Sequence, residues 1–406
     1  MLSRHSGPSN EEAPSSSMTH SSGFGVVSIG AYDRFNYGDL LFPLVLDFAA
    51  RELGYPDLTH IAPQRSDLSP VGAVPTRSIS DVYDGRTSRP TGVVLGGGEI
   101  LGATWGQAAA TITPVPFDIP LLALRKLSSR AYDAVGRLLL SGSWPTPYVP
   151  SADSVRGMPL ALNAIGASSL AVLDERTRSR VAESLRLASY ASVRDSAGHA
   201  QLARIGVQSE LAPDSVAILA RLHPAAPPRA DDEVMVVQAS RAWMRTHRRA
   251  FSDALRTVAP RFGRVELLPI GLAGAHADRE ALESVRGDLA AYGVTATVVE
   301  PTTVWTIADA IAGASIFVGT SLHGAITSMA YGTPFVPLSG IGKLGAYLES
   351  WGGEVSATPV AATDLADGVA RALRVPHDAR LAHSGELERL SWSNTERVLN
   401  AAYAGR

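Results

Sequence analysis

A single histidine interrupts a run of small and apolar residues in the segment GTSLHGAITSMAYGTP, residues 319–334. His323 falls in the turn that is expected to open a helix, where unpaired backbone N–H groups and the helix dipole favour an anion. An imidazole can gain or lose a proton near neutral pH. We therefore expect His323 to act as a general acid and base beside a bound anion. The alternative is a histidine that only fills a turn.

Two cations elsewhere in the chain could hold such an anion. Arg194 follows the short strand pattern YASV, and a guanidinium binds carboxylate or phosphate through two parallel hydrogen bonds. Its alternative role is a salt bridge with Asp195, and Asp195 or Ser196 is also expected to cap the next helix. Lys343 lies in the glycine-lined loop SGIGKLGAY. Lys126 is the only other lysine, so the chain uses arginine for most of its surface cations. We therefore expect Lys343 to have a specific role, with an ordinary exposed surface lysine as the alternative.

Further polar and glycine residues gather where predicted strands end. Ligands of parallel α/β domains bind at the carboxyl ends of the strands, so these positions are candidates for substrate binding. They are Asn36, Gly38, Asp39, Gly97, Gly98, Glu99, Ser321, Leu322 and Gly324. The glycine triplet that ends at Gly98 would let backbone N–H groups approach an anion, or would form a tight turn. For Asp39 a helix N-cap is the alternative, and Asn36 could shape its loop.

Composition narrows the class of protein. The chain has 406 residues, of which 45% are hydrophobic and 18% charged, and its net charge is -3, so we expect large buried cores and no nucleic-acid partner. The absence of cysteine excludes disulfides and thiol chemistry. We find no metal-binding spacing, no dinucleotide or Walker A loop and no nucleophile elbow, so we expect no catalytic metal. No apolar run reaches the length of a membrane-spanning helix, and residues 1–22 lack the apolar core of a signal peptide. These observations predict a cytoplasmic protein.

Strand and helix patterns alternate along the chain. Buried strands such as GFGVVSIG, MPLALNAIG and VMVVQAS are each followed by a helical pattern, which predicts parallel sheets covered on both faces. A segment rich in Pro and Ala, residues 219–233, is the best domain boundary. We predict an α/β protein with two doubly wound, Rossmann-like domains. The predicted parts are a disordered tail 1–22, an N-terminal domain 23–220, a C-terminal domain 230–378, and a helix 384–406 that crosses back to the first domain.

Residues 103–156 break this alternation. Apolar residues alternate there with Arg125, Lys126, Arg130 and Arg137 at roughly helical spacing. One interpretation is an irregular insertion that caps the first domain. The other is a basic, amphipathic element that contacts an anionic acceptor or a membrane surface. The aromatic residues of this insertion, Trp105, Trp144 and Tyr148, are candidate sugar-stacking platforms, with packing as the favoured alternative.

The motifs FNYGD, LGGGEILG, SVRDSAG, APDSV and TSLHGAITSMAYGTPFVPL, in this order, resemble the polysaccharide pyruvyl transferase family over about residues 24–345. Ser321 stands where many members carry arginine. The resemblance implies a fold similar to the two-domain GT-B glycosyltransferases. It also implies transfer of a pyruvyl group from phosphoenolpyruvate onto a sugar as a cyclic ketal, with release of phosphate. Arg194, His323 and Lys343 would be the catalytic residues.

The resemblance implies no cofactor, with phosphoenolpyruvate as donor substrate. The acceptor would be a sugar of an oligosaccharide, a glycolipid or a nucleotide sugar in polysaccharide or cell-envelope biosynthesis, with the enzyme in the cytoplasm or peripheral to the inner face of the membrane. A GT-B glycosyltransferase with a nucleotide-sugar donor is the rival. It would need an acidic residue for the ribose soon after the SLHG helix, and the nearest downstream acid is Glu349. A carbohydrate-binding protein without activity is the second rival.

Overall fold

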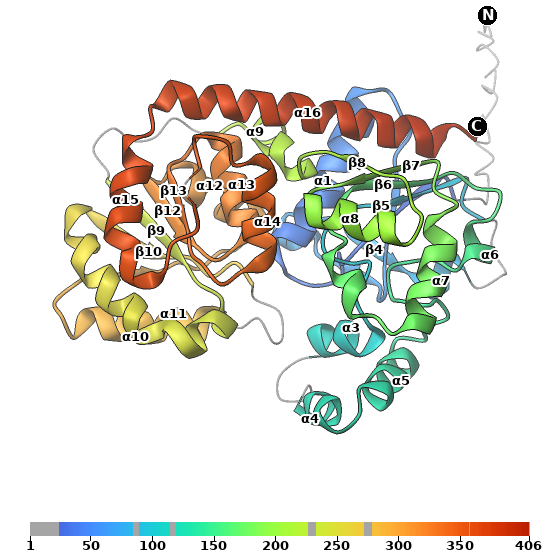
Figure 1. The fold of residues 1–406 in the computed structure, drawn as a ribbon, viewed down its shortest axis with the longest axis horizontal. Helices are drawn as coiled ribbons and strands as arrows, with labels where there is room; N and C mark the ends of the chain where they lie inside the picture. The colour runs from blue at the N-terminus through green and yellow to red at the C-terminus, as the bar shows by residue number, and fades with distance from the viewer. Residues whose placement is uncertain are drawn as a thin grey trace, which may run out of the picture.

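The described residues form two parallel sheets, each with its own helices (Figure 1). We call the part built on strands β1 to β8 the N lobe and the part built on β9 to β13 the C lobe. The computed structural model describes residues 24–83, 89–113, 119–225, 233–271, 278–356 and 358–405. The predicted tail 1–22 and residues 226–232 of the predicted boundary lie outside these ranges. No helix of the described residues is long and apolar enough to cross a membrane.

The described residues of the N lobe form an eight-stranded sheet in the order β3-β4-β2-β1-β5-β6-β7-β8, parallel except for the pair β3 and β4. The strands are β1 Val26–Ile29, β2 Thr59–Ala62, β3 Ser66–Asp67, β4 Pro75–Ser78, β5 Gly92–Leu95, β6 Leu160–Ile165, β7 Tyr190–Val193 and β8 Glu210–Leu211. Side chains alternate between the two faces of a strand. Val93 and Leu95 accordingly join a buried cluster with α3 and α7, whereas Val94 joins one with α1 and α16.

The described residues of the C lobe form a five-stranded parallel sheet in the order β11-β10-β9-β12-β13. The strands are β9 Val234–Gln238, β10 Arg264–Leu267, β11 Thr297–Val298, β12 Ile316–Gly319 and β13 Phe335–Pro337. One face packs against α10, α11 and α15, and the other against α12 and α13. Both lobes are therefore doubly wound, as the alternation of patterns predicts.

The helices found in the described residues cover these sheets or connect the lobes. They are α1 Tyr37–Glu52, α2 Ile79–Val82, α3 Trp105–Ile112, α4 Ile119–Leu127, α5 Ser129–Leu139, α6 Ala152–Val155, α7 Glu175–Leu185, α8 Ser196–Arg204, α9 Leu219–Leu222, α10 Arg241–Val258, α11 Asp278–Ala290, α12 Val304–Ala312, α13 Leu322–Tyr331, α14 Gly342–Trp351, α15 Leu365–Arg374 and α16 His377–Tyr403.

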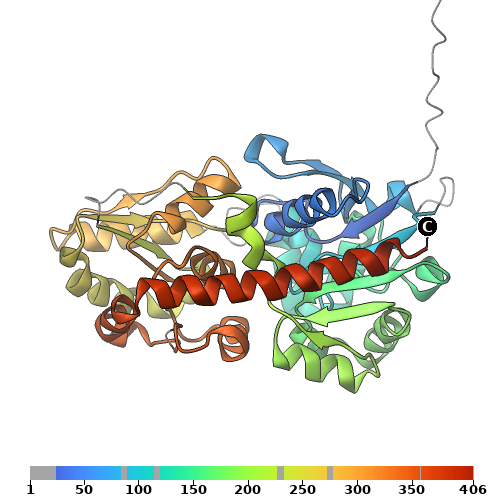
Figure 2. The same ribbon diagram turned by 90° about the horizontal axis from the view of Figure 1, so that it is seen from above.

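Helix α16 joins the two lobes along one side of the molecule (Figure 2). Near its start, the Ser384 hydroxyl donates a hydrogen bond to the Ala330 carbonyl of α13, at 2.6 Å. Farther along, the Asn394 amide donates to the Asn163 side chain of β6, at 2.9 Å. Its last turns bury Val398, among others, against the N-lobe sheet. The predicted C-terminal helix that crosses back to the first domain is thereby confirmed.

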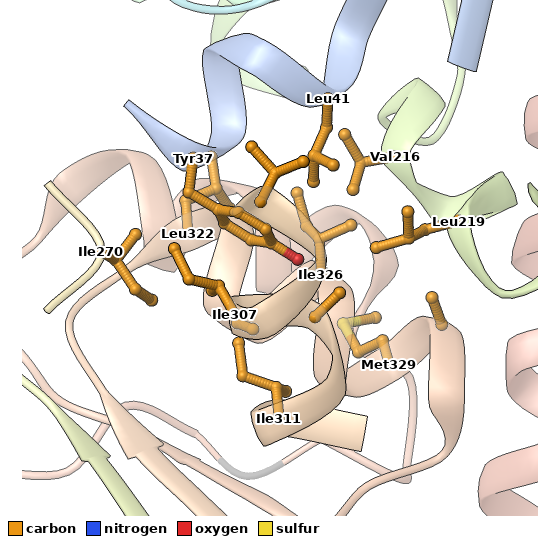
Figure 3. Close-up of a cluster of buried hydrophobic side chains, with 14 of the residues drawn as sticks. Tyr37, Leu41, Val216, Leu219, Ile270, Ile307, Ile311, Leu322, Ile326 and Met329 are labelled. Carbon is orange, nitrogen blue, oxygen red and sulfur yellow. The ribbon is translucent and has the colours of Figure 1, made fainter. Parts of the chain in front are cut away.

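Helix α1 is a second connection between the lobes. It belongs to the N lobe, but Tyr37 in its first turn is fully buried among C-lobe side chains that include Ile270, Ile307 and Leu322 (Figure 3). The Tyr37 hydroxyl and the Thr327 hydroxyl of α13 form a buried hydrogen bond at 2.9 Å. The beginning of α1 is thus held by the C lobe, which fixes this edge of the N lobe beside α13.

Two features of the N lobe differ from the prediction. Strands β2, β3 and β4 were not predicted, because sequences such as PTRS are short, polar and without clear alternation. The insertion 103–156 is not irregular: α3, α4 and α5 pack together, with Gly136 of α5 against the backbone of Trp105. Trp105 and Trp144 are buried, and the Trp105 indole donates to the Trp144 carbonyl at 3.1 Å, so these two side chains have a packing role.

We predict that Tyr37→Phe lowers the free energy of unfolding by about 1–3 kcal/mol, because the buried Thr327 hydroxyl loses its partner. The double variant with Thr327→Val should lose less than the sum of the single changes. Thermal and urea unfolding would measure both. Tyr292→Phe, at a half-exposed site, is the control and should change stability by less than about 0.5 kcal/mol. Equal losses at both tyrosines would contradict the connection described for α1.

Candidate functional site

A cavity of about 380 Å³ lies where the two lobes meet. Its N-lobe wall comes from segments that follow β1, β5 and β7, and from α3. Its C-lobe wall comes from segments that follow β9, β10, β12 and β13. Both walls are therefore built at the carboxyl ends of parallel strands, where α/β proteins bind ligands. Eight of the residues predicted for the site line it: Arg194, His323, Lys343, Asn36, Asp39, Glu99, Ser321 and Leu322.

Arg194 is the most deeply buried charge of this wall. It directly follows β7, and its side chain is 1% exposed. Its guanidinium lies 3.1 Å from a carboxylate oxygen of Asp214, 3.6 Å from Glu99 and 4.0 Å from Asp195. The expected alternative, a salt bridge with Asp195, is thus wrong as the main contact. Asp195 instead caps α8 by accepting the Gly198 N–H, at 2.7 Å.

Asp214 connects Arg194 to the histidine of the C lobe. The Asp214 oxygen that contacts Arg194 also lies 3.8 Å from His323 Nε2, and its other oxygen accepts the Val216 N–H at 3.1 Å. Burial alone would raise the pKa of Asp214. The contacts with His323 and the charge of Arg194 outweigh burial and hold this pKa below its ordinary value. Asp214 is therefore an anion that lies between the Arg194 guanidinium and the His323 imidazole.

His323 lies in the first turn of α13 and points across the lobe boundary. Its side chain is 12% exposed, and it meets the Phe42 ring of α1 edge to face at 5.3 Å. A Cβ atom at Gly38 would overlap the imidazole, so only glycine allows α1 to approach this closely. Gly38, predicted as a substrate contact, is instead the surface against which His323 is held.

The start of α13 also corrects the role predicted for Gly324. Ser321 is the N-cap residue, and its hydroxyl accepts the Gly324 N–H at 3.1 Å. This N–H group is already paired, and Gly324 does not line the cavity. Ser321 itself faces the cavity together with Leu322. Ser321, whose hydroxyl caps α13, is therefore the polar residue of this turn that can contact a ligand.

Lys343 approaches the cavity from the opposite end of the C-lobe wall. It lies in the first turn of α14 and is exposed. Desolvation by the cleft walls and repulsion from Arg194 lower its pKa, while Asp39 and Glu99 oppose this shift. Its side chain is exposed, and its ammonium group forms no ion pair with a carboxylate of the described residues. Lys343 thus faces Asp39 and Glu99 of the N lobe.

The glycine loop after β5 acts differently from the prediction. Gly97 and Gly98 have positive φ angles and do not line the cavity. The Gly98 carbonyl accepts the Gly166 N–H at 2.9 Å, so the loop is a tight turn rather than an anion cradle. A side chain at Gly166 would overlap the carboxylate of Glu99. Glu99 does reach the cavity, and its other oxygen accepts the Ser169 N–H at 2.7 Å.

The structure also corrects the role expected for Asp39 at the start of α1. Helix α1 begins at Tyr37, so Asn36 is its N-cap residue and Asp39 lies in its first turn. The expectation that Asp39 caps the helix is wrong. The Asn36 amide instead donates to the Asp39 carboxylate, at 2.8 Å, and both side chains line the cavity.

Two charged residues that line the cavity, Arg34 and Asp278, were not predicted. Arg34 pairs with Asp33 at 2.8 Å and lies with its guanidinium 5.9 Å from the centre of the Tyr148 ring. Asp278 is buried at the start of α11, where burial raises its pKa to about 6 although the Gly271 and Arg241 N–H groups donate to it. Asp214 does not line the cavity, and although the motif APDSV contains it, no role was predicted for its carboxylate. No sequence signal identifies Arg34 or Asp278, because their positions depend on contacts between distant segments.

Comparison with known proteins identifies the family. The family model for polysaccharide pyruvyl transferase matches residues 36–340, the bulk of the chain. The chain therefore belongs to the polysaccharide pyruvyl transferase family, as the sequence motifs predict. Comparison with curated proteins gave no match. Among the described residues, no cluster of three or more His, Asp or Glu side chains could hold a metal ion.

Solved structures show the fold. A protein from Listeria monocytogenes assigned as a UDP-N-acetylglucosamine 2-epimerase has 11% identity and a TM-score of 0.52, with 93% of this chain and 95% of that chain covered. S. aureus MnaA, solved with UDP, has 10% identity and a TM-score of 0.52, with the same coverage. The spinosyn rhamnosyltransferase SpnG has 12% identity, covers 93% and 100%, and has a TM-score of 0.47. The fold is of the GT-B type, with two Rossmann-like lobes.

We predict that Asp214→Asn destabilises the protein by about 3 kcal/mol at neutral pH, because Arg194 loses its nearest buried partner. The pKa of Asp214 is lower in the folded state than its ordinary value of 3.8. Its stabilising effect is therefore present above pH 3.8 and is lost as the pH falls through the folded pKa. The difference between variant and parent should shrink over that acidic range, as thermal unfolding across pH would show.

Asp153→Asn is the matched control for this experiment. Asp153 pairs with Arg156 at 3.5 Å on the surface, and both side chains are mostly exposed. Its loss should cost less than about 1 kcal/mol at every pH. A loss for Asp214→Asn that is as small as the control would show that the buried carboxylate is not what holds Arg194.

Proposed function

We propose that this protein transfers the pyruvyl group of phosphoenolpyruvate onto a sugar and forms a pyruvate ketal with release of phosphate. Membership of the family supports pyruvyl transfer. The observation that carries the proposal is that Arg194, His323 and Lys343 line one cavity at the carboxyl ends of strands from both lobes. A fixed guanidinium, an imidazole and an ammonium group in one cleft fit a small donor with a carboxylate and a phosphate.

The cations of the cavity differ in how free they are to bind the donor. The Arg194 guanidinium is shared among three carboxylates, so its main effect is to hold the N-lobe wall of the cavity in place. Its Nε atom has no hydrogen-bond partner among the described residues. Lys343 is exposed and has no ion-pair partner among the described residues. We assign the donor phosphate to Lys343 and the donor carboxylate to the side of Ser321, which also lines the cavity.

His323 is the proton donor in this proposal. The Asp214 carboxylate lies 3.8 Å from His323 Nε2, so a negative charge faces the imidazole. The proton passes to the methylene carbon of the donor, which becomes a methyl group, and an oxocarbenium-like centre develops at the adjacent carbon. A sugar hydroxyl forms a bond to that carbon, the carbon–oxygen bond to phosphate breaks, and a second hydroxyl closes the ketal. One hydroxyl proton restores His323 and the other leaves with phosphate.

The acceptor sugar belongs on the N-lobe wall. Asp39 and Glu99 both line the cavity there, opposite Lys343. Carboxylates accept hydrogen bonds from sugar hydroxyls and would hold two neighbouring hydroxyls for attack. The Asn36 amide donates to Asp39 and fixes its orientation.

The direct test is an incubation with phosphoenolpyruvate and a panel of sugar acceptors, followed by measurement of released phosphate and of product mass. The proposal expects both phosphate and an acceptor carrying pyruvate less one water. A thermal-shift titration should show stabilisation by phosphoenolpyruvate rather than by UDP or GDP. Stabilisation by a nucleotide alone, with no phosphate release, would instead support a glycosyltransferase with a nucleotide-sugar donor.

We predict that His323→Ala slows pyruvyl transfer by about 100- to 10,000-fold while thermal unfolding changes little. His323 contacts Phe42, the Gly38 backbone and, at 3.8 Å, Asp214. Because Asp214 keeps Arg194 and the Val216 N–H as partners in the variant, we expect the fold to persist. Stabilisation by phosphoenolpyruvate should persist in the variant, which separates a loss of chemistry from a loss of binding. Near-normal turnover would remove His323 from the mechanism.

We predict that Lys343→Ala raises the KM for phosphoenolpyruvate by about tenfold or more, because a charge-assisted contact with the donor is lost. Arg371→Ala is the control, since it removes an exposed positive charge from α15 outside the cavity. Steady-state phosphate release at varied donor concentration would measure both. An unchanged KM in the lysine variant would show that Lys343 does not contact the donor.

A further inference from the structure

The helices α4 and α5 project from the N lobe beyond α3, at the lower edge of the molecule in Figure 1. They expose large apolar side chains to an unusual degree: Leu127 is 84% exposed, Leu138 80% and Leu139 59%. Leu138 and Leu139 follow Val135 by three and four positions, so the three lie on neighbouring parts of one helix face. Such side chains are unfavourable in water unless another surface covers them.

Positive charges accompany these leucines. Arg125, Lys126 and Arg130 are exposed, and none forms an ion pair with a carboxylate of the described residues. The acidic residue of α5, Asp133, is turned inward, where it accepts the Gly106 N–H at 3.2 Å. Arg137 is also turned inward, toward the Pro145 carbonyl at 3.2 Å. The outer surface of α4 and α5 is therefore apolar and cationic.

This surface is one helix away from the cavity. Helix α3 packs on α5 through Gly106 and Gly136, which allow their backbones to approach closely. The opposite part of α3 contributes Gln107 and Thr111 to the cavity wall, on the side assigned to the acceptor. Anything bound at α4 and α5 would thus lie one helix away from the cavity wall that includes Asp39.

We propose that α4 and α5 dock on an anionic lipid bilayer, with Leu127, Leu138 and Leu139 in its interface and Arg125, Lys126 and Arg130 at its headgroups. Exposed leucines beside cations that have no ion-pair partner among the described residues match the chemistry of such a surface, because burial of the leucines and attraction to anionic lipid act together. It follows, if the proposed function holds, that the acceptor is a sugar carried by a membrane lipid. The carrier would present its sugar to the N-lobe wall past α3.

Vesicle flotation with the full chain tests this inference without any need for activity. Vesicles of phosphatidylglycerol and phosphatidylcholine in equal parts should bind the protein, and vesicles of phosphatidylcholine alone should bind it far less. The double variant Leu127→Ser, Leu138→Ser should weaken binding by at least about tenfold. The double variant Arg125→Ser, Arg130→Ser should weaken it by about 25-fold, which is about fivefold for each cation. All of these positions are exposed, so thermal unfolding should be unchanged.

The control removes the same charge elsewhere. Arg245 and Arg249 are exposed on α10 of the C lobe, and the double variant Arg245→Ser, Arg249→Ser should weaken vesicle binding by less than about threefold. An equal loss in this control would show that only overall charge matters and would overturn the proposal. Absence of vesicle binding by the parent chain would also overturn it, as would a leucine variant that binds normally. A leucine variant that turns a dimer into a monomer, with vesicle binding intact, would assign the face to self-association instead.

Phosphate release from phosphoenolpyruvate with a water-soluble sugar acceptor separates this inference from the proposed function. The leucine and arginine variants on α4 and α5 should retain that release, because they lie outside the cavity. A parent chain that releases phosphate but does not bind vesicles would contradict the bilayer surface alone. A parent chain that binds vesicles but never releases phosphate would contradict the proposed chemistry alone.

Discussion

A buried carboxylate holds the site of this protein together. An oxygen of the Asp214 carboxylate lies 3.1 Å from the Arg194 guanidinium of the N lobe and 3.8 Å from His323 Nε2 of the C lobe. A buried anion of this kind is tolerated only where cationic or N–H groups surround it, and removal of one partner leaves the others uncompensated. Asp214 is paired with Arg194 and the Val216 N–H, and His323 adds a longer contact from the C lobe. In our proposal the catalytic His323 is positioned by Phe42, the Gly38 backbone and this longer contact.

Three further connections maintain the relative position of the two lobes. Tyr37 inserts α1 into the C lobe, and α16 runs across both lobes. On the far side, the Trp351 indole of α14 donates to the Arg194 carbonyl at 2.7 Å. A site assembled from two lobes gains catalytic precision only when the lobes cannot slide, because reacting groups must meet within fractions of an ångström. The contacts around the cavity provide that restraint before any ligand arrives.

Strands and helices with strong hydrophobic patterns could be predicted from the sequence. The prediction failed for residues whose position depends on packing between distant segments. Continuous apolar strands and amphipathic helices identified both doubly wound lobes, but the short polar strand β4 has no such pattern. Arg194 and His323 were found because strand ends in parallel sheets converge. Gly97 and Gly98 were misread, because a positive φ angle suits a tight turn as well as an anion site. Arg34 and Asp278 reach the cavity only through contacts made after folding.

The charged groups on the two walls of the cavity differ, and this difference determines where we place the donor and the acceptor of the proposed reaction. On the N-lobe wall, Asp39 and Glu99 lie beside Arg34 and Arg194, whose guanidinium groups are already paired with Asp33 and Asp214. On the C-lobe wall, Lys343 has no ion-pair partner among the described residues. We therefore expect an anionic donor to bind at Lys343. The neutral hydroxyls of a sugar have no such constraint and can occupy the N-lobe wall. That wall continues into α3 and, beyond it, into the apolar and cationic surface of α4 and α5. Donor and acceptor would therefore enter from different sides and meet beside His323.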